Sequence, residues 1–557
     1  MIARAPAGRR LLEGLALAGL GALQTLAYTH TWAWWLPVLT LAALVWRLNG
    51  ASPFLAGLWG WCYGTGWLVA GVWWLFISMH RYGGLPAPLA ALAVLALAAA
   101  LSLYMGLAAA LYARLRRVTL WGDALLFASF FVLAEWARGI LFTGFPWVAL
   151  GYSQVDAPLA VLAPWVGVYG LGAVTAWAAA LLAGASHVRP GERPGERQGE
   201  RQGQRLPERP DERLGLRVGA RPRASLGKRF AVVAGLAALL TLPGLLGPWN
   251  FTASTGSMRV ALLQPNVQQD EKFSAESLPA TLAWVAQELL AAQADLVVTP
   301  ETAVPLLPYQ LADAAPQYWE GLVAHFAGPG RAALVGVPLG DYEKGYTNSV
   351  VGLSAAGSDY RYDKHHLVPF GEFIPKGFRW FTEMMNIPLG DFNRGVMVAP
   401  SFIVGTQRVA PHICYEDLFG EELALRFRQP DTAPTVLANI SNIAWFGNTE
   451  AVDQHRNISR LRALELQRPV IRATNTGATA VINHRGQVQA ELPPATQGVL
   501  TASVEGRTGS TVYAYWVSRL GLWPLVVLAV LLILGLSRRA VRPGVARNAE
   551  LPPGAAP

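Results

Sequence analysis

The chain has 557 residues, of which 53% are hydrophobic and only 15% are charged. These fractions exclude an ordinary soluble enzyme, and the 21 tryptophans are typical of a protein that meets membrane–water interfaces. A net charge of +9 is compatible with nucleic-acid binding, but much of the arginine lies in loops between apolar segments, which favours a membrane topology and no nucleic-acid partner. Two cysteines do not make a disulfide framework.

Apolar segments of membrane-spanning length dominate the N-terminal third of the chain. About 20 apolar residues cross the hydrocarbon core of a bilayer. We expect eight spans, six of them within residues 1–188, at positions 11–29, 31–47, 54–78, 87–113, 119–138, 157–187, 230–248 and 513–537. The first begins with basic residues, but because further spans follow it, we expect it to belong to the bundle and not to be a cleaved signal peptide.

The arginines that flank these spans predict their orientation. They precede span one and follow spans two, four, six and eight, so they share one side of the membrane (among them Arg9, Arg10, Arg47, Arg114, Arg116, Arg117, Arg538 and Arg539). The positive-inside rule assigns this side to the cytoplasm. Residues 249–512 then face outward, into the periplasm of a Gram-negative cell, and 538–557 form a cytoplasmic tail. We therefore expect a multi-pass protein of the bacterial inner membrane.

Residues 189–229 form a low-complexity segment between spans six and seven. The pattern Gly-Glu-Arg begins at Gly191, Gly195 and Gly199, and few apolar residues are available for burial. We interpret the segment as a disordered cytoplasmic loop. A contact with anionic lipid is the alternative, but the glutamates between the arginines weaken it.

The sequence pattern of residues 249–512 differs from that of the N-terminal third, because short apolar strands alternate with helices. Strands are expected at 259–264, 295–299, 332–337, 349–353, around 413, at 435–439 and at 470–474, and helices at 274–293 and 450–467. This alternation predicts an α/β layered domain with buried sheets. Functional groups of such domains gather where strands end, and Glu301, Cys414 and Asn439 all lie at such positions.

Cys414 is the one candidate sulfur nucleophile, because the other cysteine, Cys62, lies inside an apolar span. A thiol with a pKa of about 8.5 needs a base or a nearby cation to react at neutral pH. A buried glutamate such as Glu301 can take the thiol proton, and a lysine such as Lys364 can stabilise a thiolate and an oxyanion. The three residues would suffice for acyl transfer through a thioester, but their spacing in the chain does not show that they meet.

Each of these residues also has a structural interpretation. Cys414 is equally compatible with a small buried hydrophobe, Glu301 with a loop charge or a helix cap, and Lys364 with a solvated surface lysine. His365, His366 and His412 raise the question of a metal. Because neighbouring residues on a strand point to opposite faces, we expect no metal site.

Several ordered motifs resemble known families. Four stretches resemble the nitrilase (carbon–nitrogen hydrolase) superfamily, at residues 299–303, 362–372, 413–416 and 441–447. More narrowly, the chain is similar to the apolipoprotein N-acyltransferase family, since residues 135–139, 143–147, 151–154, 462–465 and 472–477 also match. The resemblance implies a membrane bundle of eight spans and a nitrilase-like αββα sandwich domain between spans seven and eight.

The same resemblance implies the roles of individual residues. Glu301 would be the general base, Lys364 the oxyanion stabiliser and Cys414 the nucleophile. Supporting residues would orient the lysine or shape the pocket, and these are Glu372, Tyr415, Glu416 and Asn348. Two positions depart from the family pattern, with Ile443 in place of an aspartate and Phe273 in place of a tryptophan. Both departures concern loop packing or lid contacts.

The implied reaction is a ping-pong transfer of a fatty acyl chain. Cys414 would take the chain from a phospholipid, typically phosphatidylethanolamine, and release a lysophospholipid. The thioester would then pass the chain to the α-amine of a diacylglyceryl-cysteine apolipoprotein, giving a triacylated lipoprotein. No cofactor is expected, because the thioester conserves the energy of the acyl bond. Both substrates are anchored in the bilayer, which would explain the membrane platform.

Two other functions remain open from the residues. A membrane-anchored nitrilase-type amidohydrolase would hydrolyse the same thioester with water. A hydrolase of small amides, however, has no need for eight membrane spans. A transporter or binding scaffold with an inactive α/β domain is the third possibility. The apolar spans contain few charges, with Asp123 and Glu135 the main exceptions, which disfavours transport.

Overall fold

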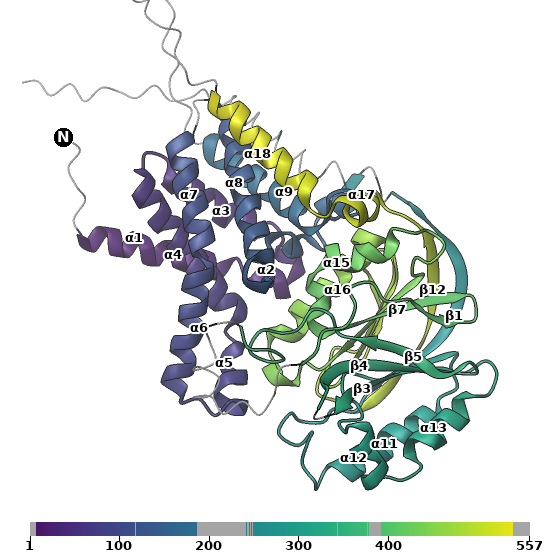
Figure 1. The fold of residues 1–557 in the computed structure, drawn as a ribbon. Coiled ribbons are helices and arrows are strands. Elements are labelled where there is room, and N and C mark those ends of the chain that lie inside the picture. Colours follow the sequence, from purple (N-terminus) through teal and green to yellow (C-terminus); the bar gives the residue numbers. More distant parts are fainter. Residues whose placement is uncertain are drawn as a thin grey trace, which may run out of the picture.

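The structure, a computed structural model, describes residues 7–116, 119–185, 249–341, 343–375 and 392–538 together with a few isolated positions between them. A helical bundle lies beside an α/β domain, and the two are in direct contact (Figure 1). The loop expected at 189–229, most of the span expected at 230–248 and nearly all of the expected tail lie outside the described residues.

The bundle consists of helices from the N-terminal part of the chain and from its C-terminal end. Its longer helices are α1 (Ala7–Leu23), α3 (Leu36–Leu48), α4 (Pro53–Val72), α6 (Ala87–Leu101), α7 (Leu103–Leu115), α8 (Leu120–Ile140), α9 (Ala163–Ala185), α17 (Val512–Leu520) and α18 (Trp523–Arg538). Shorter helical turns connect them, namely α2 (Leu26–Thr29), η1 (Thr31–Ala33), α5 (Leu75–Ile77), η2 (Ser78–Tyr82), η3 (Leu141–Thr143), η4 (Leu150–Gln154) and η5 (Pro158–Leu162).

Not all of the expected spans are found as single helices. Within the described residues, five helical stretches are long and apolar enough to cross a membrane: Gly8–Thr29, Thr31–Leu48, Ala87–Leu115, Leu120–Thr143 and Pro158–Ala185. The count rises to seven if each of two bent helix pairs is one span. The expected total of eight is therefore not confirmed.

The two bent pairs correct the expectation of continuous spans at 54–78 and 513–537. The helix axis turns by 63° between α4 and the segment Leu75–Tyr82, and by 87° between α17 and α18. The second bend has a clear local cause. Gly521 adopts a φ of +59° after the end of α17, and Pro524 is the second residue of α18. A glycine in this conformation ends a helix, and a proline is tolerated only in the first turn of the next.

Arginines expected on one side of the membrane do lie together in space. Glu13 near the start of α1 is 3.3 Å from Arg9 and 2.5 Å from Arg47 at the end of α3. Arg116, at the end of α7, donates from Nη1 to the carbonyl oxygen of Leu48 at 3.2 Å. Three of the predicted basic positions therefore meet at one end of the bundle.

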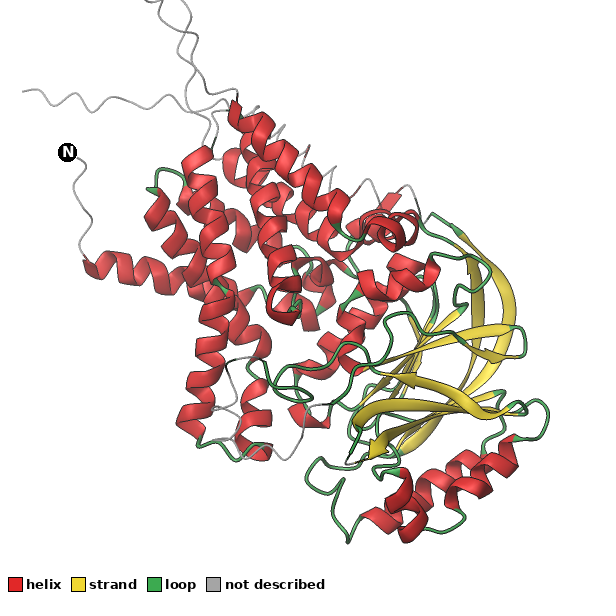
Figure 2. Ribbon diagram, viewed as in Figure 1, coloured by secondary structure: helices red, strands yellow, loops and turns green. Residues whose placement is uncertain are grey.

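The α/β domain contains two six-stranded sheets (Figure 2). The first has the order β12-β1-β2-β3-β4-β5 and the second the order β11-β10-β9-β8-β7-β6. In each sheet the three consecutive strands β1-β2-β3 or β7-β8-β9 are parallel, and the other neighbours are antiparallel. The strands are β1 (Thr252–Gln264), β2 (Leu296–Val298), β3 (Ala332–Asp341), β4 (Gly345–Ser354), β5 (Gly357–Asp363), β6 (Phe402–Val404), β7 (Gln407–Ile413), β8 (Val436–Ser441), β9 (Val470–Thr474), β10 (Ala480–Ile482), β11 (Val488–Glu491) and β12 (Gly498–Gly509).

Helices cover the outer faces of both sheets, and apolar side chains fill the space between the sheets. Val260 and Leu334 of the first sheet belong to the same buried cluster as Val409 and Ile471 of the second. The first sheet packs its other face on α11 (Leu278–Ala291) and α13 (Tyr318–Phe326), near α12 (Pro308–Ala314). The second is covered by α15 (Gly420–Ala424) and α16 (Glu450–Leu466), as Figure 1 shows. The expected αββα sandwich is confirmed.

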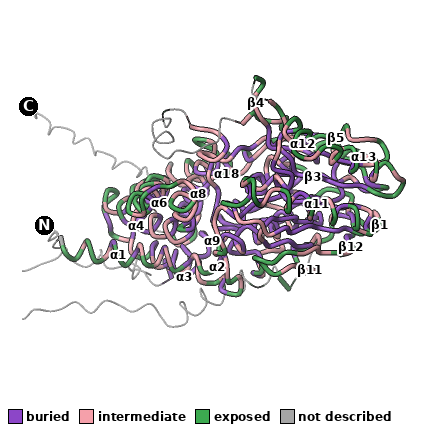
Figure 3. The backbone as a smooth tube through the Cα atoms, turned by 90° about the horizontal axis from the view of Figure 1, so that it is seen from below, coloured by how far each residue is buried: buried purple, intermediate pink, exposed green. Residues whose placement is uncertain are grey.

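Helix α16 lies between the second sheet and the bundle, and this position explains its unusual sequence. It is rich in polar residues, yet most of them are buried. Asn457 donates from Nδ2 to the carbonyl oxygen of Tyr28 at 2.9 Å, and Glu465 accepts the backbone N–H of Val168 at 2.6 Å. Polar groups of α16 thus bond to the bundle, and helix α9, which contains Val168, is largely buried (Figure 3).

Candidate active site

The residues expected to carry chemistry meet at the ends of strands from both sheets. Glu301 follows β2, Lys364 follows β5, and Cys414 follows β7. Asn348 lies within β4, beside the end of β5, because its carbonyl oxygen accepts the backbone N–H of Lys364 at 2.8 Å. The fold therefore brings together groups that are more than a hundred residues apart in the chain.

Lys364 is held between two carboxylates. Its Nζ lies 2.9 Å from Glu372 Oε2 and 3.5 Å from Glu301 Oε1, and the lysine side chain is only 1% exposed. Asn348 joins the same two acids, since its Nδ2 donates to Glu301 Oε1 at 2.6 Å and to Glu372 Oε1 at 2.7 Å. Burial opposes the charge on Lys364, but the two carboxylates outweigh burial and raise the pKa of its ammonium. Lys364 is therefore a fixed cation at neutral pH.

The two acids differ in their remaining contacts. Glu301 Oε2 accepts the backbone N–H of Asn442 at 2.8 Å, in the loop after β8. Glu372 Oε2 accepts the backbone N–H of Val368 at 2.8 Å, within its own turn. Glu301 is thus tied to the second sheet, whereas Glu372 is tied to the loop that carries the lysine.

Cys414 is the first residue of the helical turn η6 (Cys414–Leu418) and directly follows β7. Its φ of +50° is a left-handed conformation that L residues other than glycine rarely adopt. The side chain is partly buried. Burial raises the pKa of the thiol to about 12, and the charge of Glu301 acts in the same direction, whereas Lys364 and the Ser441 hydroxyl lower it. The thiol is therefore protonated at neutral pH and must lose its proton to react.

Glu416 connects the loops of the lysine and the cysteine. Its Oε2 accepts from the backbone N–H of Ile413 and from the hydroxyl of Tyr362, each at 2.6 Å. Its Oε1 accepts from the backbone N–H of His365 at 2.7 Å. Tyr415, next to it, points toward the bundle and donates from its hydroxyl to the carbonyl oxygen of Gly144 at 3.0 Å. Glu416 thus fixes loop geometry, and Tyr415 joins the site to the bundle.

The structure adds a residue that the sequence did not single out. Lys272 is buried, and its Nζ donates to the backbone carbonyl oxygen of Glu301 at 2.9 Å. Burial lowers the pKa of this ammonium to about 8, against the attraction of Glu301 and Cys414. Lys272 and Glu301 line a small cavity beside the site, together with Thr302 and Asn475. Lys272 lies in the polar run 268–272. Because the whole run is polar, the sequence did not indicate that this lysine is buried.

The positions that depart from the family pattern lie in different environments. Ile443 is buried within the large apolar cluster of the bundle and α16, so an aspartate would be a poor fit there. Phe273 is 59% exposed. Its ring is therefore not packed into the core of the α/β domain.

The predicted histidines have structural partners. His366 stacks on Phe419 with ring centroids 3.5 Å apart, and its two ring nitrogens lie 2.9 Å from Glu422 Oε1 and 3.0 Å from the carbonyl oxygen of Thr143. His365 Nδ1 lies 2.7 Å from the carbonyl oxygen of Gly395. Across the described part of the chain, no group of three or more His, Cys, Asp or Glu side chains is arranged to hold a metal ion.

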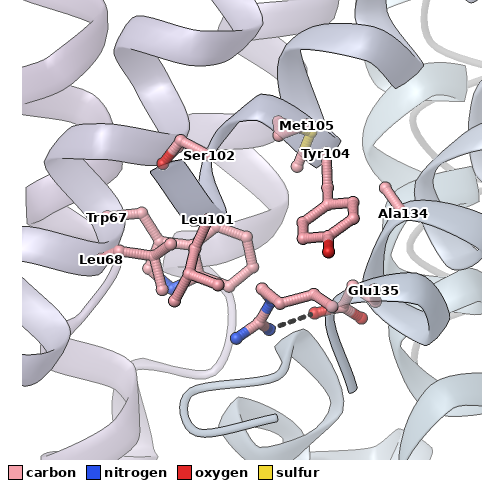
Figure 4. Close-up of a pocket in the computed structure, with 10 residues that line it drawn as sticks. Trp67, Leu68, Leu101, Ser102, Tyr104, Met105, Ala134 and Glu135 are labelled. Carbon is pink, nitrogen blue, oxygen red and sulfur yellow. Dashed lines mark hydrogen bonds and ion pairs between the residues drawn. The ribbon is translucent and has the colours of Figure 1, made fainter. Parts of the chain in front are cut away.

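A loop of the bundle lies directly against the site and is held by a buried ion pair. Arg138 Nη2 is 3.5 Å from Glu135 Oε1, and Arg138 Nη1 donates to the carbonyl oxygens of Phe145 and Trp147, both at 2.8 Å. The two charged residues line an otherwise largely apolar pocket between α4, α8 and the junction of α6 and α7, in which Trp67 and Tyr104 also lie (Figure 4). The ion pair thus fixes the loop that Tyr415 contacts.

Comparisons with known proteins agree with this architecture. The family model for the apolipoprotein N-acyltransferase N-terminal domain matches residues 20–181, and the carbon-nitrogen hydrolase model matches residues 259–513. An apolipoprotein N-acyltransferase of Verminephrobacter eiseniae (strain EF01-2) is 49% identical over 525 residues, which cover 91% of this chain and 92% of the relative. Another, of Ralstonia nicotianae, is 42% identical over 549 residues, covering 97% of this chain and 96% of the relative.

Among solved structures, a carbon-nitrogen hydrolase from Helicobacter pylori G27 shares 17% identity at a TM-score of 0.33, and covers 48% of this chain and 94% of that chain. The identities of 49% and 42% to the two apolipoprotein N-acyltransferases extend over 91% and 97% of this chain. The chain therefore belongs to the apolipoprotein N-acyltransferase family, with a catalytic domain of the carbon–nitrogen hydrolase superfamily.

Proposed function

We propose that this acyltransferase moves a fatty acyl chain from a phospholipid to the N-terminal α-amine of a diacylglyceryl-cysteine apolipoprotein, through a thioester on Cys414. The observation that carries the proposal is the buried cluster of Glu301, Lys364 and Glu372 beside the strained cysteine turn. Phosphatidylethanolamine is the expected donor, and the products are a lysophospholipid and a triacylated lipoprotein.

The first half-reaction requires one nucleophile, one base and one cation. Cys414 Sγ attacks the acyl carbonyl carbon while Glu301 takes the thiol proton. The proton must be removed during the attack, because the raised pKa keeps the thiol protonated at neutral pH. Lys364 donates to the oxyanion that forms, because both carboxylates keep it charged. Glu301 then returns the proton to the departing glycerol oxygen, and the C–O bond breaks as the C–S bond remains.

The second half-reaction uses the same groups in reverse. The neutral α-amine of the acceptor attacks the thioester carbon, and Glu301 takes a proton from the nitrogen. The C–S bond breaks, and the proton passes to the Cys414 sulfur. Glu372 contacts Lys364, and Asn348 contacts both Glu301 and Glu372. In the proposal, these two residues hold the ammonium of Lys364 and the carboxylate of Glu301 in position.

Contacts between the α/β domain and the bundle support a membrane-anchored reaction. Tyr415, next to the nucleophile, bonds to Gly144 of the bundle, and His366, near Lys364, lies against Thr143. Both proposed substrates carry acyl chains in the bilayer, so a site in contact with apolar helices supports a reaction at the membrane surface. The arginines gathered at one end of the bundle favour an inner-membrane orientation with the catalytic domain in the periplasm.

A product assay with both substrates tests the proposal. Purified protein in detergent is incubated with phosphatidylethanolamine and a synthetic diacylated lipopeptide with a free α-amine. We expect the lipopeptide to gain one acyl group, detected by its mass, with Cys62→Ala active and Cys414→Ser inactive. Release of free fatty acid with no gain on the lipopeptide would overturn the proposal in favour of a hydrolase. Full activity in Cys414→Ser would exclude the thioester.

A further inference from the structure

The backbone of Cys414 is held in its strained conformation by two side chains outside the catalytic cluster. The left-handed conformation brings the side chain of a residue other than glycine too close to the following carbonyl oxygen, so it needs supporting contacts. The carbonyl oxygen of Cys414 receives His455 Nε2 at 3.2 Å and Asn439 Nδ2 at 3.4 Å. These two hydrogen bonds to one carbonyl group help to offset the strain.

The surroundings of His455 determine which of its nitrogens carries the proton. Arg472 Nη2 lies 3.2 Å from His455 Nδ1, and a guanidinium group only donates, so Nδ1 accepts. The proton of the neutral ring is therefore on Nε2, which is the nitrogen that faces the carbonyl oxygen of Cys414. The contact between His455 and the nucleophile's backbone is thus a true donor–acceptor pair.

Buried charges keep the ring in this state. Arg472 is itself bonded to Asp417 Oδ2 at 3.4 Å and to the hydroxyl of Ser459, and His412 lies 3.1 Å from Asp417 Oδ1. Burial, together with the positive charge of Arg472, lowers the pKa of His455 to about 3, against the attraction of Asp417. His455 therefore stays neutral across the physiological range and serves as a constant donor.

One face of the His455 ring is covered by a residue of the bundle. Trp147 stacks on the imidazole, with ring centroids 5.7 Å apart and an angle of 22° between the rings. The indole Nε1 of Trp147 donates to Gln454 Oε1 at 2.7 Å, which fixes the indole on α16. The carbonyl oxygen of Trp147 is in turn held at 2.8 Å by Arg138, whose ion pair with Glu135 is drawn in Figure 4. A continuous series of contacts therefore joins the helices of the bundle to the carbonyl of Cys414.

We propose that His455 is a positioning residue for the nucleophile, and that the bundle loop at Trp147 holds it in place. His455 bonds to the backbone of Cys414 and keeps the turn in its left-handed conformation, so that the thiol stays beside Glu301 and Lys364. The bundle is then needed for the reactivity of the cysteine as well as for anchoring. This inference rests on the proposed role of Cys414 as nucleophile.

Variants at position 455 separate the donor from the volume of the ring. In a Cys62→Ala background, acyl transfer from phosphatidylethanolamine to the diacylated lipopeptide is followed by the mass of the lipopeptide for His455→Leu and His455→Gln. We expect His455→Leu to lower kcat at least tenfold with KM for the phospholipid changed less than twofold. His455→Gln, which offers an amide donor, should recover most of the loss. Equal losses in the two variants, or wild-type kcat in His455→Leu, would overturn the proposal.

The contribution of the bundle is tested at Trp147 against a matched tryptophan. Trp136 packs on Trp523, with ring centroids 5.7 Å apart, and has no ring contact with His455 among the described residues. Trp147→Leu should lower kcat at least threefold, and Trp136→Leu should not. Equal effects of the two substitutions would contradict the role of the bundle loop. The comparison of Trp147→Leu with Trp136→Leu also tests the proposal if His455→Leu fails to fold.

Alkylation of Cys414 by iodoacetamide tests the positioning without any lipid. Releasing the turn frees the thiol from the burial and the Glu301 charge that together raise its pKa. His455→Leu should therefore react at least threefold faster at pH 8, and His455→Gln at close to the wild-type rate. Alkylation that is equal in all three proteins would overturn the proposal. Failure of the wild type to form an acyl-enzyme would instead count against the proposed function, and the alkylation result would still report on the positioning.

Discussion

Replacing Lys364 with methionine leaves two buried carboxylates without the cation they share. The lysine is 1% exposed and lies 2.9 Å from Glu372 Oε2 and 3.5 Å from Glu301 Oε1. Removing one partner of a buried ion pair typically costs about 3–5 kcal/mol, because the other charge stays buried and unpaired. At roughly 2–4 °C per kcal/mol for a domain of about this size, the melting temperature of Lys364→Met should fall by about 6–20 °C.

The loss should be reversed in part by removing one of the acids. Lys364→Met/Glu372→Gln has one fewer buried charge, so it should regain at least half of the lost melting temperature, although acyl transfer stays abolished in both variants. Intrinsic tryptophan fluorescence during heating in detergent measures the transition. Cys414→Ser, which is also inactive but changes no charge, is the control and should melt close to the wild type. A single variant as stable as the wild type, or a double variant less stable than the single one, would refute the electrostatic account of this cluster.

Three further predictions concern the thiol and the loops around it. Glu301→Gln should lower acyl-enzyme formation at least about a hundredfold, because the base is lost. The same variant should speed iodoacetamide alkylation of Cys414 at pH 8, since loss of the negative charge lowers the thiol pKa; slower alkylation would contradict this sign. In a Cys62→Ala background, alkylation should rise by about tenfold per pH unit from 7 to 10, because only the thiolate reacts and burial raises the thiol pKa to about 12. A plateau below pH 9 would show that the thiol pKa is not raised. Glu416→Gln should destabilise the protein by about 1–3 kcal/mol, because an amide donor then faces buried donors; an unchanged melting temperature would argue against its role as the link between the two loops.

Much of the α/β domain was predictable from local patterns. The apolar runs at 295–299 and 470–474 correspond to β2 and β9, and the helix expected at 450–467 corresponds to α16. Because Glu301 and Cys414 directly follow strands, their position at one edge of the sheets also follows from sequence. Lys364 and Asn348 are different. Their spacing holds no sign that they meet, and only the resemblance to known families placed them beside the base.

Other features depend on tertiary contacts that no local pattern encodes. Lys272 stands in a polar run that is typical of a surface loop, and it is buried only because that loop folds over Glu301. His455 belongs to a polar helix whose burial requires the bundle on its other side. The bends in the spans are an intermediate case. Gly521 and Pro524 are a recognisable helix stop, but they stand inside an apolar run long enough to predict one continuous span.

Intact-mass spectrometry of the purified protein after incubation with phosphatidylethanolamine tests the central claim most directly. We predict a mass increment of one fatty acyl group on Cys414, stable in buffer and discharged by a diacylated lipopeptide amine. The increment should be absent in Cys414→Ser. An unmodified wild-type protein, or an increment that water removes as fast as the lipopeptide does, would contradict an acyl transfer through this cysteine.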